Sequence, residues 1–289
     1  MKPAVFGYAR PETLDEALAT LAELGEEGKV LAGGQSLVPL MNMRLALPAW
    51  LVDIGRVHGL DELRRENGEV RIGARVTQAQ LEDTRGAGSP LLAEAVGWIG
   101  HRTLRNRGTV CGSLAHADPA GELPAAAVAL DARLRLASVR GVRELRAREF
   151  FLAPLTTVVE PDELLCEAVF DLWPQATGSV TEVTRRHGDF ALAGATVALS
   201  WENGRIGRAG VALCGAAPVP TAVTEAEALL AGSAGEPEAV LEAALAAGRA
   251  ARPTDDYHAT AAYRRAMAEE MTRQALLQAI AAWPEAGAQ

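Results

Sequence analysis

Cysteine and histidine are scarce in this chain of 289 residues, which contains three cysteines and five histidines. Cys111, Cys166 and Cys214 lie far apart and form no CxxC pair, so the sequence predicts free thiols in a reducing compartment rather than a disulfide framework. An iron–sulfur cluster needs a full set of thiolate ligands, so we do not expect one within this chain. Because no HExxH or CxxH pattern occurs, we also expect no protein-bound metal.

Basic residues are fewer than acidic ones, with Lys plus Arg 28, Asp plus Glu 37 and a net charge of -9. A chain this acidic is a poor candidate for binding nucleic acid, which requires a basic surface. The longest apolar run, from Phe190 to Trp201, is well short of the roughly 20 residues that span a bilayer. The apolar N-terminal stretch ends at Arg10 and Pro11 and is unlike a signal peptide. These features predict a cytoplasmic protein without a membrane span.

The composition is that of a globular protein, with 49% hydrophobic and 22% charged residues. At roughly 150 residues per domain, the length indicates about two domains or one large one. A stretch rich in Pro, Gly, Thr and Ser over residues 174–179 is typical of a linker. We therefore predict one domain over residues 1–176 and a second over residues 177–289.

Strand-like and helix-like segments alternate along the first domain. Thr13 and Glu16 form a capping box at the start of an amphipathic helix that Gly25 is placed to end. Thr77 and Gln80 form a second capping box. Further strands are predicted over 4–8, 29–32, 50–54, 70–74 and 134–136, and further helices over 37–44, 91–99 and 122–131.

The second domain begins with a predicted hairpin. Strands over residues 191–201 and 205–213 are joined through Asn203-Gly204, and Asn-Gly is the strongest short hairpin signal because both positions tolerate positive φ. The remainder is rich in alanine and helical, with a break at 232–235 and a long final helix over residues 263–282.

Two glycine-containing segments are the candidate functional features. In Leu31–Val38 a strand stops, Gly33 and Gly34 allow close backbone approach, and a helix starts at a position where its free N–H groups can bind a pyrophosphate. Taken alone, the segment slightly favours a plain tight turn with Ser36 as the helix N-cap. It is not a GxGxxG fingerprint.

The second segment, Thr109–Pro119, offers a glycine, hydroxyls and another turn with N–H donors. Two such turns in one domain raise the odds of a dinucleotide site, because a dinucleotide has two phosphates and two sugars that separate loops can hold. A basic cluster of Arg102, Arg105 and Arg107 precedes this segment. It is about as well explained by a solvated face as by neutralisation of a cofactor phosphate.

These motifs carry a family resemblance. Residues 32–41, continuing to Arg44, resemble the first flavin-binding loop of the FAD-binding medium subunits of molybdenum hydroxylases, a family that includes the flavoprotein subunits of carbon monoxide dehydrogenase and of xanthine dehydrogenase-type enzymes. Residues 109–118 resemble the second loop, typically Thr-Ile-Gly-Gly-Ser followed by Ala-His-Ala-Asp-Pro. Residues 185–191 and 255–264 resemble two landmarks of the family's C-terminal domain. The four landmarks occur in the family's order and cover nearly the whole chain.

The sequence departs from the family pattern at two positions. Cys111 stands where a second glycine is commoner, which could alter the approach of the backbone to a phosphate. Gln35 stands where some members have His. The cysteine-rich insertion that gives a few members an extra iron–sulfur cluster is absent from the sequence, in line with its three cysteines.

The resemblance implies an α+β fold. The first domain would be a two-lobed FAD-binding domain of the vanillyl-alcohol oxidase (PCMH) type, with lobes at about 1–56 and 57–176, followed by a smaller α+β C-terminal domain. FAD would lie extended between the lobes, with main-chain N–H groups of both loops on its pyrophosphate and Asp118 near its ribityl or adenosine part. The residues that the resemblance assigns to FAD are Ala32, Gly33, Gly34, Gln35, Ser36, Leu37, Thr109, Cys111, Gly112, Ser113, Asp118, Leu165 and Arg186.

The resemblance also implies an electron-transfer role. A partner large subunit would bind molybdopterin and hydroxylate the substrate, and a small subunit would carry two [2Fe–2S] clusters. Electrons would pass through FAD in this chain to an external acceptor such as NAD⁺ or a quinone. The assembly that the resemblance implies is a dimer of heterotrimers. The redox chemistry belongs to the cofactor, so no catalytic acid or base is assigned.

Two other functions remain open at this point. The chain could be a stand-alone FAD-dependent oxidoreductase of the same superfamily, with its own substrate pocket, which the C-terminal landmarks disfavour. It could also be a scaffolding or nucleotide-sensing subunit that has lost the cofactor, which the two loops disfavour because both are intact apart from Cys111.

Overall fold

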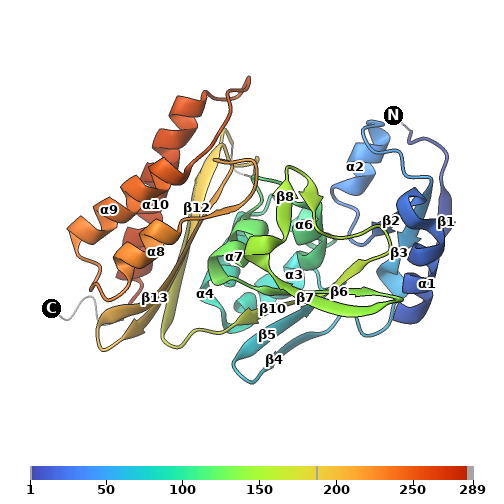
Figure 1. Ribbon diagram of the computed structural model, residues 1–289, viewed down its shortest axis with the longest axis horizontal. Coiled ribbons are helices and arrows are strands. Elements are labelled where there is room, and N and C mark those ends of the chain that lie inside the picture. The colour runs from blue at the N-terminus through green and yellow to red at the C-terminus, as the bar shows by residue number, and fades with distance from the viewer. Residues whose placement is uncertain (1, 187, 285–289) are drawn as a thin grey trace.

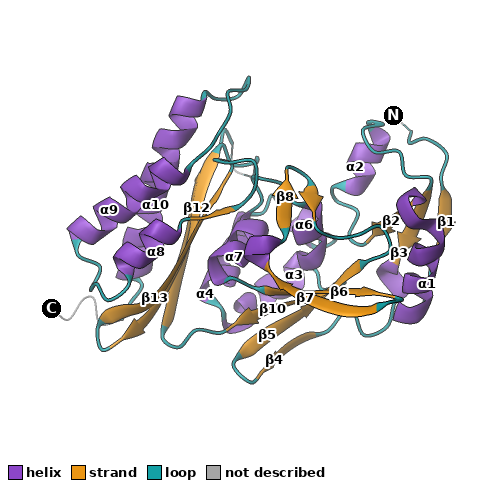
Figure 2. Cartoon of the chain, in the orientation of Figure 1, coloured by secondary structure: helices purple, strands orange, loops and turns teal. Residues whose placement is uncertain are grey.

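The computed structural model describes residues 2–186 and 188–284 and consists of three groups of strands and helices that follow one another in space as in sequence (Figure 1). The N-terminal lobe, the middle lobe and the C-terminal part each contain one main β-sheet with helices packed against it (Figure 2). The arrangement agrees with the predicted α+β class, in which a two-lobed first part precedes a smaller C-terminal part. Among the described residues, no helix is both long and apolar enough to cross a membrane.

The N-terminal lobe is a three-stranded parallel sheet in the order β1-β3-β2. The predicted capping box is confirmed: Thr13 accepts the Glu16 N–H, Glu16 reaches back to the Thr13 N–H, and the helix ends at Gly25. The predicted first strand begins only at Gly7. The elements are β1 (Gly7–Ala9), α1 (Leu14–Leu24), β2 (Gly28–Leu31), α2 (Leu37–Asn42) and β3 (Trp50–Asp53).

The middle lobe is an antiparallel sheet in the order β4-β5-β10-β6-β7, with helices on one side of it (Figure 1). Every residue of α7 after Glu122 is buried, because this helix lies between the middle lobe and the C-terminal sheet. The strands are β4 (Leu63–Glu66), β5 (Glu69–Gly73), β6 (Arg133–Ser138), β7 (Gly141–Arg146), β8 (Phe151–Ala153), β9 (Thr156–Thr157) and β10 (Leu164–Asp171). The helices are α3 (Gln78–Asp83), α4 (Pro90–Trp98), α5 (Arg102–Arg105), α6 (Val110–His116) and α7 (Glu122–Leu130).

The C-terminal part is an antiparallel sheet in the order β11-β12-β13-β14, with helices on its outer face. The predicted hairpin is confirmed, since Asn203 and Gly204 both have positive φ, 51° and 74°. Nearly all of β12 is buried, because α10 covers one side and α4 and α7 cover the other. The elements are β11 (Ala176–Val183), β12 (Ala193–Glu202), β13 (Arg205–Cys214), β14 (Thr221–Ala222), α8 (Thr224–Leu230), α9 (Pro237–Ala250) and α10 (Ala261–Ala281).

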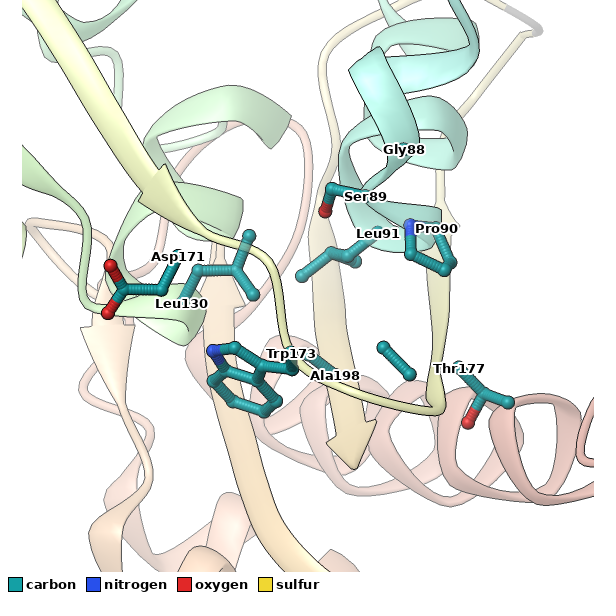
Figure 3. A pocket seen from close by; sticks show the side chains of 10 residues that line it. Gly88, Ser89, Pro90, Leu91, Leu130, Asp171, Trp173, Thr177 and Ala198 are labelled. Atoms are coloured by element: carbon teal, nitrogen blue, oxygen red, sulfur yellow. The ribbon is translucent and has the colours of Figure 1, made fainter. Parts of the chain in front are cut away.

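A small pocket marks the junction where the N-terminal end of α4 meets the connection from β10 to β11 (Figure 3). The ring of Trp173 forms part of its wall and carries the Arg208 guanidinium 4.0 Å from the ring centroid on its face. Gly178 of β11 lies so close to α4 that an added Cβ would stand 2.8 Å from the Leu91 nitrogen. The C-terminal sheet is therefore packed directly onto the middle lobe.

Candidate cofactor site

The two glycine-containing segments are in contact in the structure. A Cβ added to Gly33 would lie 2.1 Å from the Arg107 carbonyl oxygen and 2.9 Å from the Gly108 Cα. A Cβ added to Gly112 would lie 3.9 Å from the Cβ of Ala32. The two loops predicted to share a ligand therefore lie side by side, one at the end of β2 and the other at the start of α6.

The first loop presents unused hydrogen-bond donors. Gly34 has φ of +72°, a left-handed conformation that glycine adopts without strain. Within the described residues, the main-chain N–H groups of Gly34, Gln35 and Ser36 have no acceptor. Ser36 stands at the N-cap position of α2, but its side chain makes no capping hydrogen bond. The alternative that Ser36 serves only as a cap is therefore wrong.

The second loop is a helix N-terminus and not the predicted turn. Thr109 is the N-cap of α6, and its hydroxyl oxygen accepts the Gly112 N–H at 3.1 Å. The Ser113 N–H donates to the Thr109 carbonyl, and the Val110 N–H donates to Val76. The sequence Thr-x-x-Gly favours this outcome because a threonine hydroxyl satisfies an orphan N–H of the first helical turn. Of the predicted donors in this loop, those of Thr109 and Cys111 remain without an acceptor in the described chain.

The Cys111 side chain points away from the loop surface. It is buried, and its thiol donates to the Ile72 carbonyl of β5 at 3.5 Å. Burial raises the pKa of this thiol far above its usual value, as it does for Cys214, and burial raises the pKa of Cys166 as well. The expectation that Cys111 alters the approach of the backbone to a phosphate is therefore not supported by its position. Its side chain anchors α6 on the middle sheet.

Two arginines of the basic cluster before the second loop form ion pairs with carboxylates of α3. Arg105 is buried and makes a two-pronged contact with Glu82, at 2.9 and 3.0 Å. Arg102 pairs with Glu82 and Asp83, each at 2.7 Å. Arg105 fits neither of the two explanations offered by the sequence, a solvated face or a phosphate contact, because it is buried against Glu82. Arg102 is exposed, as the solvated-face explanation predicts. Both arginines hold α5 against α3 and so fix the backbone of Arg107 against the first loop.

Asp118 lies just beyond the C-terminal end of α6. Its carboxylate accepts the Ala120 N–H at 2.9 Å, and its carbonyl accepts the Gly121 N–H. The neighbouring His116 is half-buried, and burial lowers the pKa of its imidazole although the charge of Asp118 opposes this. These contacts shape the turn from α6 into α7. They leave one carboxylate oxygen of Asp118 without a protein partner in the described chain.

Leu165 belongs to the same buried core cluster as Val110 and Cys111 of the second loop, and β10 packs against α6. For Arg186, no hydrogen bond or ion pair to either loop is present among the described residues. Leu165 is buried in β10 opposite Leu136, directly before an irregularity in the strand pairing. Arg186 is exposed on the connection from β11 to β12, where its carbonyl accepts the Asp189 N–H. His187, within the landmark at 185–191, lies outside the described residues.

The sequence did not reveal what lies behind the first loop. The backbone of Arg107 and Gly108 forms that surface, so Gly33 needs to lack a side chain on its inner side. The one available signal was Gly108 itself, which stands directly before the N-cap Thr109. Sequence motifs describe side chains, so they do not predict a close contact that is formed by main-chain atoms on both sides.

The residues present fit an anionic dinucleotide. The segment from Leu31 to Val38 has no acidic side chain, its N–H groups at 34–36 are unpaired, and its glycines leave no Cβ at the contact with the second loop. Unpaired main-chain donors of this kind bind phosphate oxygens without a cationic side chain. The arrangement can hold a diphosphate and orient the group attached to it.

Comparison with known proteins identifies two family domains in the chain. Residues 4–170 match the FAD binding domain in molybdopterin dehydrogenase, and residues 179–279 match the CO dehydrogenase flavoprotein C-terminal domain. Among related proteins, the alpha subunit of the 6-hydroxypseudooxynicotine dehydrogenase complex of Paenarthrobacter nicotinovorans is 37% identical, covering 97% of this chain and 96% of the relative. The medium chain of carbon monoxide dehydrogenase of Hydrogenophaga pseudoflava is also 37% identical, covering 98% and 99%.

Solved structures give the same result. Carbon monoxide dehydrogenase from Hydrogenophaga pseudoflava superposes with a TM-score of 0.94 at 37% identity, covering 97% of this chain and 99% of that one. Quinoline 2-oxidoreductase from Pseudomonas putida 86 superposes with a TM-score of 0.90 at 32% identity, with the same coverage. Both likenesses extend over essentially the whole length of the chain.

Proposed function

Because this chain belongs to the FAD-binding medium subunits of the molybdenum hydroxylase family, we propose that it is the subunit in which electrons pass from [2Fe–2S] clusters of a partner, through FAD, to an external acceptor. The chain is thus a subunit of an oxidoreductase, and its cofactor is FAD. The contact between Gly33 and the Arg107–Gly108 backbone carries the proposal, because it brings the two cofactor loops together.

FAD, when bound, supplies one-electron and two-electron redox chemistry. The chain's own residues bind and orient it. The N–H groups of Gly34, Gln35 and Ser36, together with that of Cys111, hold the diphosphate, and the Ser36 hydroxyl adds a donor. Asp118 holds a sugar hydroxyl of the ribityl or adenosine part with its free carboxylate oxygen. In this proposal the backbone of Leu165 would contact the flavin or the adenine, and Arg186 would approach the flavin edge.

The partners belong to the same proposal. Relatives named as a medium chain or medium subunit come from enzymes of several subunits. We assign to the complex a molybdopterin-binding large subunit and a small subunit with two [2Fe–2S] clusters, assembled as a dimer of heterotrimers. We also propose a domain boundary at 176/177, next to the start of β11 at Ala176; its support is that it falls between the two matched family domains.

Flavin reduction tests this function directly. The purified chain is expected to be yellow and to release FAD on denaturation. In the reconstituted complex, the substrate of the large subunit should reduce the flavin, and omission of the small subunit should abolish that reduction. If the chain alone is reduced by a substrate, a stand-alone oxidoreductase is the correct description. A colourless preparation that does not take up FAD contradicts both functions.

A further inference from the structure

The hairpin of β8 and β9 stands at the end of α6 that is farther from the second cofactor loop (Figure 1). The helix begins after its N-cap Thr109 and is capped at its other end by Ala117. The Leu155 N–H, in the turn between β8 and β9, donates to the Ala117 carbonyl at 3.0 Å, and β9 packs against α6. The hairpin turn therefore lies next to the connection from α6 to α7, which contains Asp118.

The base of this hairpin is fixed on the core of the middle lobe. Phe150 is fully buried, and its ring meets the ring of Phe151 edge to face with centroids 5.1 Å apart. The Val158 N–H donates to the Phe150 carbonyl at 3.0 Å, and Phe151 is paired with Thr157 across the hairpin. The turn is thus held from its base and, through the Leu155 N–H, from α6, which gives Leu155 a defined position.

Leu155 has a backbone conformation that favours glycine. Its φ is +57°, in the left-handed region, where the Cβ of a bulky residue comes too close to the following carbonyl oxygen. Glycine adopts this conformation without strain. The Leu155 side chain is 54% exposed, so it gains much less from burial than a core leucine does. The fold itself therefore has little use for a leucine here, and strained residues of this kind cluster at ligand contacts.

The position of Leu155 suits a ring system of the cofactor. The helix α6 is seven residues long, about 10 Å at 1.5 Å per residue. A dinucleotide whose diphosphate lies at the N-terminal end of α6 can therefore place one of its ring systems at the other end. Main-chain donors and the Asp118 carboxylate bind phosphate and hydroxyl groups, but a flat ring requires apolar contacts. The exposed Leu155 side chain offers such a contact.

We propose that Leu155 is a further cofactor-binding residue, whose side chain packs against the ring system of FAD that lies at the C-terminal end of α6. The inference rests on the proposed function, because it requires FAD to be held by the two loops. The adenine and the isoalloxazine of FAD are both flat aromatic rings and offer the same apolar surface. The measurements described next distinguish the two rings.

Replacing Leu155 by glycine separates cofactor binding from folding. Leu155→Gly removes the side chain and leaves a residue that adopts φ of +57° without strain. The melting temperature of the full-length, flavin-free chain should therefore stay within about 3 °C of the wild type. Titration of this chain with FAD should show about tenfold weaker binding, because the cofactor no longer covers the exposed part of a leucine side chain.

Two further variants serve as controls. Leu155→Met keeps an apolar side chain of similar size and should bind FAD within about threefold of the wild type. Gln175→Gly changes another exposed residue with left-handed backbone, at φ of +48° in the connection from β10 to β11, and should leave FAD affinity unchanged. In Leu155→Gly, altered absorption bands of the bound flavin identify the isoalloxazine as the ring in contact. Weaker binding with unchanged bands identifies the adenine.

The inference is overturned if the wild type binds FAD and Leu155→Gly binds it within about threefold as tightly. It is also overturned if flavin-free Leu155→Gly is unfolded or melts well below the wild type, because the side chain would then belong to the fold. Binding by Leu155→Met that is as weak as that of Leu155→Gly excludes the apolar contact as the cause. A wild-type chain that takes up no FAD is a different result, since it contradicts the proposed function and this contact together.

Discussion

A methyl group at Gly33 should separate the two cofactor loops. In the structure, the added Cβ of Gly33→Ala would lie 2.1 Å from the Arg107 carbonyl oxygen, whereas real Cβ atoms essentially never approach a neighbour closer than 3.0 Å. The loops must therefore move apart by at least 0.9 Å (3.0 − 2.1). The obstacle is backbone, fixed from behind by the Arg105–Glu82 contact, so it cannot turn aside as a flexible side chain could.

The size of the effect follows from the cost of overpacking. Forcing an extra carbon into a packed site typically costs about 1–3 kcal/mol, and a backbone obstacle places this variant near about 3 kcal/mol. The strain can relax when the loops open, but a cofactor that contacts both loops holds them closed. The cost therefore falls mainly on binding, and about 3 kcal/mol corresponds to roughly 100-fold weaker FAD affinity.

Titration of the flavin-free protein with FAD, followed by quenching of flavin fluorescence, measures this affinity. The control is Gly97→Ala in α4, because a Cβ there meets nothing within 4 Å and the position is helical. Gly97→Ala should bind FAD like the wild type and be slightly more stable, since alanine is the better helix former. If Gly33→Ala binds FAD within about threefold of the wild type, the loops do not hold the cofactor jointly and the reasoning is refuted.

Three further variants test neighbouring features. Gly34→Val should lose FAD on gel filtration, because a β-branched residue is strained at φ of +72° and the loop must rearrange; retention of a full complement of flavin would contradict the assignment of this loop. Thr109→Ala removes the cap of α6 and should lower the stability to urea by about 1 kcal/mol; an unchanged urea midpoint would show that the cap contributes nothing. The Ala259 N–H and Arg264 lower the pKa of Asp256 to about 2. The ionised Asp256 carboxylate therefore stabilises the folded chain at neutral pH, and this stabilisation is lost as pH falls from about 4 towards 2. Asp256→Asn should melt lower at pH 7 and approach the wild type near pH 2.5, and a constant difference across that range would exclude this carboxylate as the cause.

Local signals in the sequence were sufficient for much of the fold. The capping boxes at Thr13 and Thr77 and the hairpin at Asn203-Gly204 appear as predicted, because each depends on residues a few positions apart. The middle sheet could not be assembled from such signals. Its central strand β10 pairs with β5 and β6, and nothing local in a sequence encodes which distant strands become neighbours.

The candidate cofactor site was likewise predictable from the sequence only in part. Gly33, Gly34 and Gly112 were identified from composition and spacing, and they are in the two loops that meet. The roles of the arginines at 102 and 105 were missed, because their partners are carboxylates on α3, about 20 positions away with no motif to connect them. The raised pKa values of Glu122 and Glu182 could not be predicted either, because burial by elements distant in the chain raises the pKa of each carboxyl.

The burial of the cysteines has a practical consequence for spectroscopy. Cys111 and Cys214 are enclosed and Cys166 is half-buried, and raised pKa values keep all three thiols in the unreactive protonated form at neutral pH. The native protein should therefore resist maleimide dyes and nitroxide spin labels. A cysteine introduced at an exposed position such as Val142 or Leu241 would be the fast-labelling thiol, so paired probes can report distances within the assembled enzyme without first removing the natural cysteines.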